Sequence, residues 1–461
     1  MPSTTTPPRP RMSSRPKPLR IKRAKPPRKA PLYVLVALIC AGLGITVGLA
    51  VLAETMADLQ QPGGWVIAGA RLTGLVGAYL MLISVLLIAR IPLIERVIGQ
   101  DRLVSFHRQL GAWPLVLILI HMVLTIVGYA ERYSNTWYGE LWLMCTDYPG
   151  VLLAIIGTAL ITLAGVTSYR IARRRLKYET WWIVHLYIYL ALALSFPHQI
   201  ATGTSFVGHP ANRAWWIAIW IATAGVAILY RFLLPTFRSL RHQLKVVQIK
   251  EEAPGVVSLI VEGRKLERLA VSGGQFFQWR FLVKGHWWQA HPYSLSAMPR
   301  PPYLRVTVKD LGDASGAMRW LKPGTRVAIE GPYGTFTRFS KEGNHVLLAG
   351  AGVGVTPLRA LIEDLPHNTD VVCVLRARSE EDIPHLEEIR RLVERRDGRL
   401  HTLIGTRDQV PIDQALPAVV PDIAGRDIYV CGPRDFTTAV EETAVRWGAD
   451  MDQIHSEAFA F

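Results

Sequence analysis

The sequence predicts a helical membrane bundle followed by two soluble domains, a small antiparallel β-barrel and an α/β domain. Three observations support this fold class. Half of the 461 residues are hydrophobic, and in the first half of the chain they gather into long apolar runs. From about residue 241, short alternating runs are punctuated by glycine and proline. After residue 344, short buried strands alternate with helices, which is typical of a parallel sheet.

Residues 1–31 are predicted to form a disordered basic tail. Residues 1–30 contain ten Lys or Arg, eight Pro and no acidic residue, so they cannot bury a core. An arm that binds nucleic acid or lipid is one interpretation. We favour a cytosolic topogenic tail, because an apolar segment follows at once, and we expect no nucleic acid partner. That apolar segment is too long for a cleavable signal.

Residues 32–235 contain six apolar segments, each close to the roughly 20 residues that cross a bilayer. Basic residues cluster after the second, fourth and sixth segments, and acidic residues predominate after the others. Under the positive-inside rule both termini are cytoplasmic. We therefore expect a multi-pass protein of the inner (plasma) membrane, in contact with membrane lipid. The predicted spans are Leu32–Ala53, Gly64–Ile91, Val104–Tyr129, Gly150–Ile171, Trp181–Phe196 and Ala214–Leu234.

Four histidines in this region are spaced alike. His107 and His121 are 14 residues apart, and His185 and His198 are 13 apart, so each gap is roughly 20 Å along a helix. The third and fifth spans run in the same direction, which places the histidines level in two pairs. Such pairs can each hold an iron porphyrin between two imidazoles. For any single histidine, a packing hydrogen bond or a proton relay is the alternative. His209, in the outer loop, is a possible substitute ligand or an exposed loop residue.

Residues 241–340 are predicted to form the barrel, and they contain two aromatic turn motifs. In His291-Pro292-Tyr293-Ser294 the tyrosine can pack on a flavin ring and the serine can hydrogen-bond its edge. A Gly-Pro-Tyr-Gly sequence follows at 331–334. Donors for a flavin phosphate could come from Lys309, Gly312, Ser315 and Gly316. Taken singly, each of these is an ordinary turn. The predicted strands are Lys245–Ile249, Val256–Val261, Phe276–Phe281 and Leu304–Val308.

Residues 344–461 carry three motifs at the carboxyl ends of predicted strands, where parallel sheets bind ligands. Gly350-Ala-Gly352-Val-Gly354-Val-Thr356-Pro357 leads from a strand into a helix and can hold a pyrophosphate. Arg376 and Arg378 could hold a 2′-phosphate, which favours NADP over NAD, or they form a solvated charge pair. Cys431-Gly432-Pro433 could present a thiol to a nicotinamide, or its cysteine is a core residue. The predicted elements are strands His345–Leu348, Val371–Leu375 and Ile428–Val430, and helices Leu358–Leu365 and Ile383–Glu394.

This order of motifs, ending in an aromatic residue, resembles the ferredoxin–NADP reductase module. Attached behind six spans with the paired histidines, residues 32–461 as a whole resemble the NADPH oxidase and ferric reductase superfamily. The resemblance implies three kinds of cofactor: FAD, NADPH and two haem b groups. His107 with His185 would ligate the inner haem, and His121 with His198 the outer haem.

The resemblance also assigns roles in the reductase half. His291, Pro292, Tyr293 and Ser294 would bind FAD. The nicotinamide nucleotide would be bound by Gly350, Gly352, Gly354, Thr356, Cys431, Gly432 and Pro433. The final residue, Phe461, would cover the flavin ring until nicotinamide displaces it. Arg71, near the outer end of the second span, would lie beside the outer haem.

The implied function is electron transfer from cytosolic NADPH through FAD and two haems to an acceptor outside. With oxygen as acceptor the product is superoxide, and Arg71 would attract the anion. An arginine is costly in a membrane without a function, which favours this hypothesis. One alternative is a ferric-chelate reductase with Glu131, Glu140 and Asp147 attracting the metal. Another is a non-catalytic quinol or partner-protein electron donor that feeds a periplasmic (extracytoplasmic) enzyme. Thr125 replaces a second outer-side histidine of the oxidases, and Tyr-Ser replaces their Phe-Thr.

Overall fold

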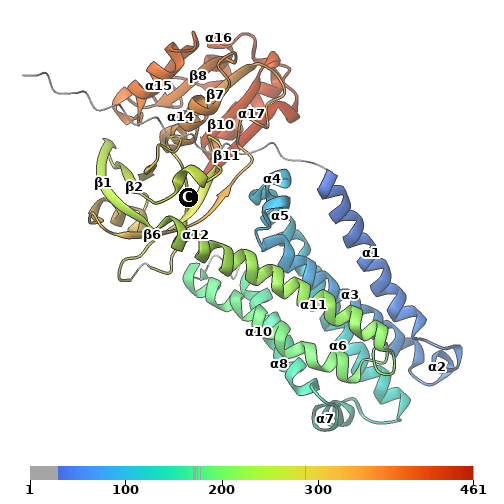
Figure 1. The fold of residues 1–461 in the computed structure, drawn as a ribbon. Coiled ribbons are helices and arrows are strands. Elements are labelled where there is room, and N and C mark those ends of the chain that lie inside the picture. Colours follow the sequence, from blue (N-terminus) through green and yellow to red (C-terminus); the bar gives the residue numbers. More distant parts are fainter. Residues whose placement is uncertain (1–29, 170–172, 174, 177, 286, 460–461) are drawn as a thin grey trace, which may run out of the picture. The chain divides into compact units, whose positions relative to one another are not determined.

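The computed structural model describes residues 30–169, 173, 175–176, 178–285 and 287–459, and these form two compact units. One unit is helical and precedes residue 237; the other contains the sheets (Figure 1). The predicted fold class is confirmed, since six long apolar helices precede an antiparallel sheet and a parallel sheet. Of the predicted basic tail, residues 1–29 lie outside the described part of the chain, and helix α1 already begins at Ala30.

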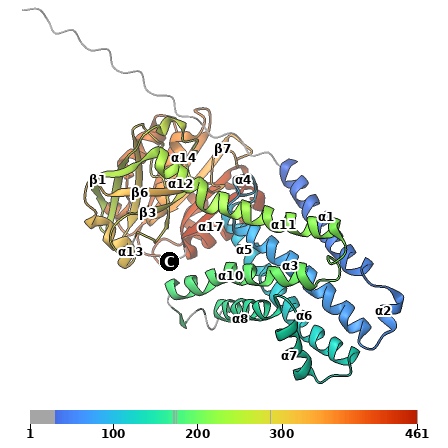
Figure 2. The same cartoon turned by 60° about the horizontal axis from the view of Figure 1, so that its bottom comes forward.

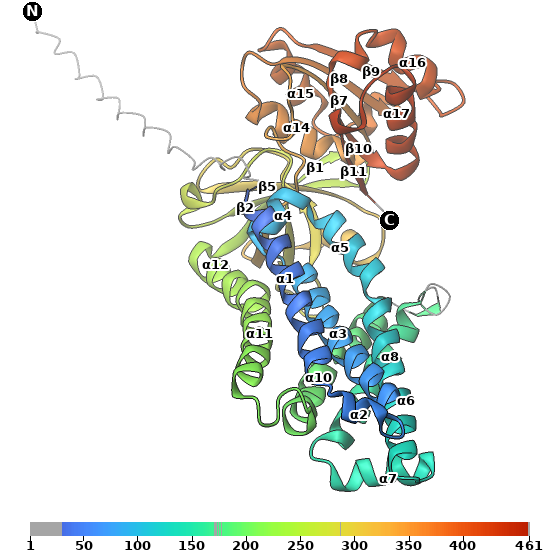
Figure 3. The ribbon, with the colours of Figure 1, turned by 90° about the vertical axis from the view of Figure 1, so that its right-hand side faces the viewer.

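In the helical unit, each predicted span overlaps one of six helices that are long and apolar enough to cross a membrane. The fifth continues beyond its predicted end at Phe196 to Thr202, through Pro197. The short helices α2 and α7 lie at one end of the bundle (Figures 1 and 3). The helices are α1 (Ala30–Leu52), α2 (Met56–Gln60), α3 (Gly64–Ile88), α4 (Pro92–Ile98), α5 (Gln100–Leu110), α6 (Ala112–Arg132), α7 (Trp137–Asp147), α8 (Val151–Ser168), α10 (Tyr178–Thr202), α11 (Pro210–Ile228) and α12 (Leu234–His242).

Glycines let the helices of this unit approach closely. A Cβ atom on Gly74 of α3 would lie 2.6 Å from Nδ1 of His121 on α6. A Cβ atom on Gly157 of α8 would lie 2.8 Å from the carbonyl oxygen of Ala191 on α10, and these two helices run side by side (Figure 2). Small residues drive helix packing in membranes because lipid offers no hydrophobic effect between helices. The close contacts therefore hold the histidine-bearing helices α6 and α10 in place.

The first sheet of the second unit has six strands in the order β4-β3-β6-β1-β2-β5. Alternate residues of β3 are buried, among them Phe277, Trp279 and Phe281, because side chains alternate across a strand. An isolated bridge between Leu295 and Val306 joins the end of β4 to β5, so the sheet curls toward the predicted barrel. The four predicted strands lie within β1, β2, β3 and β5. The strands are β1 (Leu244–Ala253), β2 (Val256–Glu262), β3 (Phe276–Phe281), β4 (His291–Ser294), β5 (Tyr303–Lys309) and β6 (Arg326–Tyr333).

The second sheet is parallel, in the order β11-β10-β7-β8-β9. Helices α14 and α15 cover one face, and α16 and α17 cover the other (Figure 3). The chain proceeds from β7 toward β9 and then returns to β10 on the other side, so the strand order reverses between β7 and β10. The elements are β7 (His345–Ala351), α14 (Val355–Asp364), β8 (Asp370–Ala377), α15 (Leu386–Glu394), β9 (Arg399–Ile404), α16 (Ile412–Val419), β10 (Asp427–Pro433), α17 (Arg434–Arg446) and β11 (Ile454–Phe459).

The predicted elements of this sheet are present, and two of its helices begin at other residues than predicted. The helix predicted from Ile383 begins only at Leu386, because His385 takes a left-handed conformation with φ +61°. The helix predicted from Leu358 begins earlier, at Val355. Ligands of such sheets bind where the strand order reverses, outside the carboxyl ends of the strands. That crevice lies between the ends of β7 and β10.

Candidate functional site

The first histidine pair joins α5 to α10. The ring centroids of His107 and His185 are 6.1 Å apart and their planes are inclined at 85°. Nδ1 of His107 lies 3.0 Å from both the carbonyl and the hydroxyl oxygen of Ser84. Nδ1 of His185 lies 3.2 Å from Oγ of Ser168. Both rings are therefore oriented through Nδ1, and among the described residues no hydrogen bond to Nε2 of either ring is found.

The second pair lines one cavity. His121 on α6 and His198 on α10 both contribute to a cavity of about 230 Å³ within the helical unit. Nδ1 of His121 lies 2.7 Å from the carbonyl oxygen of Ala70. Nδ1 of His198 is buried without a hydrogen-bond partner in the described structure. His209 is exposed at the start of α11 and does not line this cavity, as expected of a loop residue.

These pairs fit a group held between two imidazoles. Histidine ligands in proteins usually donate the ring N–H that faces away from the metal to a carbonyl or another acceptor, which is the pattern at His107, His121 and His185. Two metal–imidazole bonds of about 2 Å each, added to two ring radii, match the 6.1 Å between His107 and His185. The residues present therefore fit two bis-histidine haems.

Arg71 lines the same cavity as His121 and His198, and it has a partner that sequence reasoning missed. Its Nη1 lies 2.7 and 2.8 Å from the two carboxylate oxygens of Glu54, and the Glu54 side chain is only 8% exposed. The sequence offers one signal for this partner, because Glu54 is an acidic residue directly after the first predicted span. Thr125, also in the lining, donates its hydroxyl to the carbonyl of His121 at 2.6 Å, a bond within its own helix.

The three acids proposed to attract a metal on the outer side do not form one surface. Glu131 and Asp147 are exposed, but Glu140 is fully buried and accepts a hydrogen bond from Asn135 at 3.2 Å. The expectation of a solvated loop is therefore wrong for Glu140, because α7 folds its acid inward. This arrangement leaves only two of the three carboxylates accessible to a metal chelate.

A cavity of the reductase unit lies at the reversal point of the parallel sheet. It has a volume of about 840 Å³, within the usual range for small-molecule sites. Gly352, Arg376, Arg378 and Pro433 line it, as the sequence motifs predict, and Lys309 lines it as well. The sequence thus brings three separate strand ends to one cavity.

Glycine is required at two positions of the 350–357 motif, for a different physical reason at each. Gly352 has φ +56°, which L side chains rarely adopt, and it lines the cavity. A Cβ atom on Gly354 would overlap the carbonyl oxygen of Cys431 on the neighbouring strand. Gly350 pairs in register with Cys431, and Thr356 donates its hydroxyl to the carbonyl of Val353 at 2.9 Å. The motif therefore packs directly onto Cys431-Gly432-Pro433 at the end of β10.

Four arginines line the cavity, two more than the sequence motif suggests, namely Arg376, Arg378, Arg407 and Arg446. Arg376 donates to the carbonyl oxygen of Val410 at 2.8 Å, and burial together with the charge of Arg407 lowers its pKa. Arg378 is exposed and makes no hydrogen bond or ion pair within the described residues. Arg407 pairs with exposed Asp435 at 3.0 Å. Arg407 follows the third parallel strand, β9, so the rule applied to Arg376 could also have found it.

Cys431 is part of the core in this structure. Its side chain is fully buried among residues of α14 and the sheet, and burial raises the pKa of its thiol. The thiol is therefore uncharged at neutral pH. Its proposed role toward a nicotinamide stays a prediction. Phe461, assigned to cover the flavin, lies outside the described residues.

The four residues of the predicted flavin motif, His291–Ser294, form strand β4. The ring of Tyr293 stacks on His291 with centroids 6.0 Å apart, and burial raises the pKa of Tyr293 to about 12. Trp279 donates its indole N–H to the carbonyl of Tyr293 at 3.0 Å, and Ser294 is buried beside exposed Pro292.

The phosphate stretch that begins at Lys309 is already bonded within its own turn. The hydroxyl of Ser315 accepts from the amide of Leu311 at 2.8 Å and donates to the carbonyl of Gly312 at 3.1 Å. Gly316 ends the same short helix, Asp313–Gly316. The hydroxyl of Ser315 therefore already has its hydrogen-bond partners. The backbone amides of this turn remain as the donors that a flavin phosphate could use.

Comparison with known families assigns three parts of the chain. Residues 73–196 match the ferric reductase like transmembrane component, residues 241–337 an FAD-binding domain, and residues 348–442 an oxidoreductase NAD-binding domain.

Similar proteins are known for parts of the chain. The ferredoxin reductase component of 3-ketosteroid-9-alpha-monooxygenase from Mycolicibacterium smegmatis is 32% identical over 231 residues, 47% of this chain and 65% of that protein. The putative respiratory burst oxidase homolog protein G of Arabidopsis thaliana is 29% identical over 34% of this chain and 21% of its own length. The flavohaem-like FAD/NAD-binding domain of nitric oxide dioxygenase from Vibrio cholerae covers 47% of this chain and 98% of its own, with 23% identity and a TM-score of 0.42. The chain spans about two thirds of the length of the first of these relatives.

Six apolar helices with a ferric reductase-like component, followed by FAD- and NAD-binding domains, define a multi-pass membrane oxidoreductase that depends on NAD(P)H. The chain thus carries a ferric reductase like transmembrane domain and a C-terminal reductase module of the ferredoxin–NADP reductase type, and part of it is similar to a respiratory burst oxidase homolog.

Proposed function

We propose that this protein carries electrons from cytoplasmic NADPH, through FAD and two haem b groups, to molecular oxygen on the outer side of the inner membrane. Each NADPH would reduce two oxygen molecules to superoxide and leave NADP⁺ and one proton. The observation that carries the proposal is the pair of histidine sites, one with centroids 6.1 Å apart and one around a shared cavity. The basic loops after the second, fourth and sixth spans support cytoplasmic termini.

On the cytoplasmic side, the chain would bind and orient the nucleotide. The exposed guanidinium of Arg378, with Arg376 and Arg407, offers positive charge to a 2′-phosphate at the rim of the 840 Å³ cavity. The loop from Gly350 to Thr356 lets backbone approach the pyrophosphate. Tyr293 and Ser294 on β4 supply the flavin platform. FAD accepts two electrons as a hydride and can release them singly, which matches a two-electron donor to one-electron carriers.

Within the membrane, the chain would fix four imidazoles. Ser84, Ser168 and Ala70 hold Nδ1 of three of them, which leaves Nε2 of each ring available as a metal ligand. Haem with two imidazole ligands carries one electron at a time and is saturated at the iron. The two sites divide a roughly 30 Å apolar core into shorter steps.

Oxygen is the preferred acceptor because Arg71 lies in the cavity of the outer histidine pair. A guanidinium there favours an acceptor that becomes an anion when it is reduced. The similarity to a putative respiratory burst oxidase homolog points the same way. A ferric-chelate reductase and a donor to an extracytoplasmic partner are the alternatives, and the burial of Glu140 weakens the first of them.

The decisive test is an optical titration of the purified full-length protein. NADPH is added without oxygen, and we expect reduced haem b bands at two haems per flavin. Air is then admitted, and superoxide dismutase-sensitive reduction of a dye should accompany reoxidation. A flavin spectrum without haem would overturn the histidine assignment. Reoxidation by a ferric chelate but not by air would replace oxygen with a metal acceptor.

A variant pair then tests Arg71. Arg71→Gln should lower superoxide formation several-fold while NADPH still reduces both haems, and Arg71→Lys should retain most of the activity. Unchanged superoxide formation in Arg71→Gln would show that the guanidinium does not act on oxygen.

A further inference from the structure

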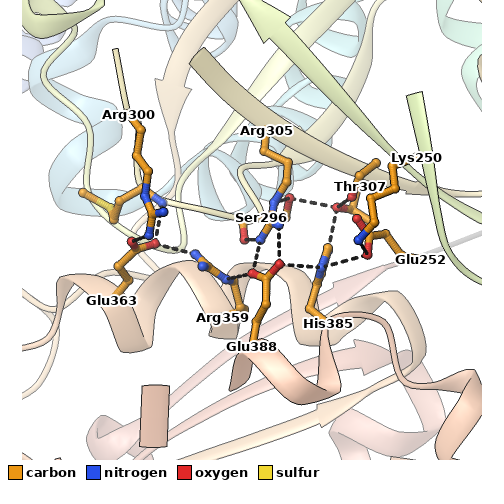
Figure 4. Close-up of polar contacts among 12 residues, drawn as sticks. Lys250, Glu252, Ser296, Arg300, Arg305, Thr307, Arg359, Glu363, His385 and Glu388 are labelled. Atoms are coloured by element: carbon orange, nitrogen blue, oxygen red, sulfur yellow. Dashed lines mark hydrogen bonds and ion pairs between the residues drawn. The ribbon is translucent and has the colours of Figure 1, made fainter. Parts of the chain in front are cut away.

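An ion-pair network joins the FAD-binding sheet to the nucleotide-binding domain within the reductase unit (Figure 4). At its centre, Glu388 of α15 accepts hydrogen bonds from two arginines. One carboxylate oxygen lies 2.8 Å from Nη1 of Arg305 on β5. The other lies 2.8 Å from Nη2 of Arg305 and 2.9 Å from Nε of Arg359 on α14. A single carboxylate therefore contacts guanidinium groups from both domains.

Each arginine is linked to a predicted cofactor motif, Arg305 by hydrogen bonds and Arg359 by its place in the chain. Arg305 also donates to the carbonyl oxygen of Ser296 at 3.0 Å and to its hydroxyl at 3.2 Å. Ser296 is two residues beyond Ser294, the last residue of the flavin tetrapeptide. Arg359 is three residues beyond Thr356 on the helix that the glycine loop begins. The Glu388 carboxylate thus connects the flavin strand with the helix that carries the nucleotide loop.

The surroundings make this connection stiff. Arg359 is 5% exposed, and it also pairs with Glu363 of its own helix. Glu363 in turn accepts from the amide of Met298 at 3.0 Å and from Arg300 at 2.7 Å. The hydrogen bonds from Arg305 lower the pKa of Glu388 to about 2, so the carboxylate stays charged at neutral pH. Fork-shaped arginine–carboxylate pairs restrict orientation as well as distance.

The two domains have separate hydrophobic cores. Their relative placement, unlike the fold of each, depends on contacts across the boundary. Hydride transfer is sensitive to that placement, since a misplacement of about 1 Å can cost on the order of 100-fold in rate. A charged, bidentate contact between the two cofactor-bearing segments is suited to fixing the relative placement of the two domains.

We propose that Glu388 is a positioning residue for hydride transfer from NADPH to FAD, acting through Arg305 and Arg359 on the flavin strand and the nucleotide helix. The reaction moves one hydride from the nicotinamide to the flavin and leaves NADP⁺. The inference rests on the NADPH-to-flavin half of the proposed function and is independent of the acceptor.

The test is stopped-flow reduction of the flavin by NADPH, without oxygen, in the full-length FAD-loaded protein. In Glu388→Gln we expect a flavin reduction rate at least ~10-fold lower, a larger isotope effect with NADPH deuterated at the transferred position, and an NADPH dissociation constant within about twofold of wild type. The matched control is Glu387→Gln, whose exposed side chain pairs with Arg390 at 3.3 Å on the same helix; it should behave as wild type.

Some outcomes would overturn the positioning role. One is a reduction rate and isotope effect equal to those of the control. Another is a loss of thermal stability with both kinetic quantities unchanged, which would make the network structural only. If Glu388→Gln does not retain FAD, the Arg305→Lys variant is tested by the same criteria. Lysine keeps the positive charge but cannot form the two-point contact of the guanidinium. If NADPH fails to reduce the flavin of the wild type, the proposed function itself fails, and the positioning role with it.

Discussion

Arg71 and Glu54 form a two-point ion pair, in which Nη1 of the arginine lies 2.7 and 2.8 Å from the two carboxylate oxygens. The pair explains how an arginine is tolerated beside an apolar cavity, since a charge buried in a membrane needs a partner. The cost of Arg71 in the bilayer is therefore offset by Glu54 and is no longer by itself an argument for a role with oxygen. The proposed role rests on the position of Arg71 in the cavity that His121 and His198 also line.

The first prediction is energetic coupling within this pair. Glu54→Gln and Arg71→Gln should each lower the melting temperature of the detergent-purified protein, because each leaves one charge unpaired in a largely buried place. The double variant should lose less than the sum of the two, with a coupling of roughly 0.5–3 kcal/mol. Thermal unfolding of the four proteins measures it. Strict additivity would mean that the two side chains do not interact in solution.

The second prediction concerns the stoichiometry of haem. His185→Ala should remove one of two haems per chain and leave the other, because His121 and His198 belong to a separate cavity. His209→Ala, which changes an exposed histidine outside that cavity, should keep both. Haem is counted as its pyridine complex against flavin. Two haems in His185→Ala would disprove the assignment of this residue.

The third prediction concerns the choice between NADPH and NADH. Arg378→Ala should raise the KM for NADPH about 10-fold or more and leave that for NADH nearly unchanged, because hydrogen bonds to a charged group contribute about 1.5–3 kcal/mol. Arg395→Ala, on the exposed end of α15, is the control. Flavin reduction rates over a range of nucleotide concentrations give both constants. An equal rise for both nucleotides would point away from the 2′-phosphate.

The fourth prediction is a pH dependence of stability caused by His385. Its side chain is fully buried, Nε2 lies 2.9 Å from the hydroxyl of Thr307, and burial lowers its pKa to about 3. The unfolded chain, with an ordinary pKa near 6.5, binds a proton that the folded state refuses. Stability is therefore complete above pH 6.5 and falls as pH decreases toward 3, by at most about 1.4 kcal/mol per pH unit. The charged groups facing it are Lys250, Glu252, Arg305, Arg359 and Glu388.

A variant isolates this contribution. His385→Asn suits the left-handed backbone at this position and has no group that titrates near neutrality. Release of FAD on heating, followed by fluorescence between pH 7 and pH 5, should then show a flatter profile than wild type. Glu388, whose folded-state pKa is lowered to about 2 by Arg305, is present in both proteins, so its contribution to the slope is shared and cancels in the comparison. Parallel profiles would rule out His385 as the source.

Much of the fold follows from local patterns. Apolar runs of about 20 residues predicted the six spans, and period-two alternation predicted β1, β2, β3 and β5. β4 and β6 were not predicted as strands, because proline and glycine in His291-Pro292-Tyr293-Ser294 and at 331–334 resemble turns. Helix α15 begins three residues late because the left-handed conformation of His385 interrupts an otherwise helical pattern.

The candidate sites divide in the same way. The histidine spacing, the glycine loop and Arg376 with Arg378 were visible because regular helices and parallel strands bring residues at known intervals to a common place. Arg407 was missed although it obeys the same rule, because β9 itself was not predicted. The burial of Glu140 depends on how α7 folds back, which its sequence does not show.

The sequence by itself determined the spans, the positions of the four histidines along their helices and the three motifs at strand ends, because these depend on periodicity within one element. Only the tertiary structure decided the partners: Glu54 for Arg71, 17 residues away, and Arg305 for Glu388, 83 residues away. For a given local sequence, a charged side chain can face either water or another segment of the protein. Which of these it meets is set by the packing of whole elements. The charge balance of the cavity around Arg71 and the link between the reductase domains therefore appear only in three dimensions.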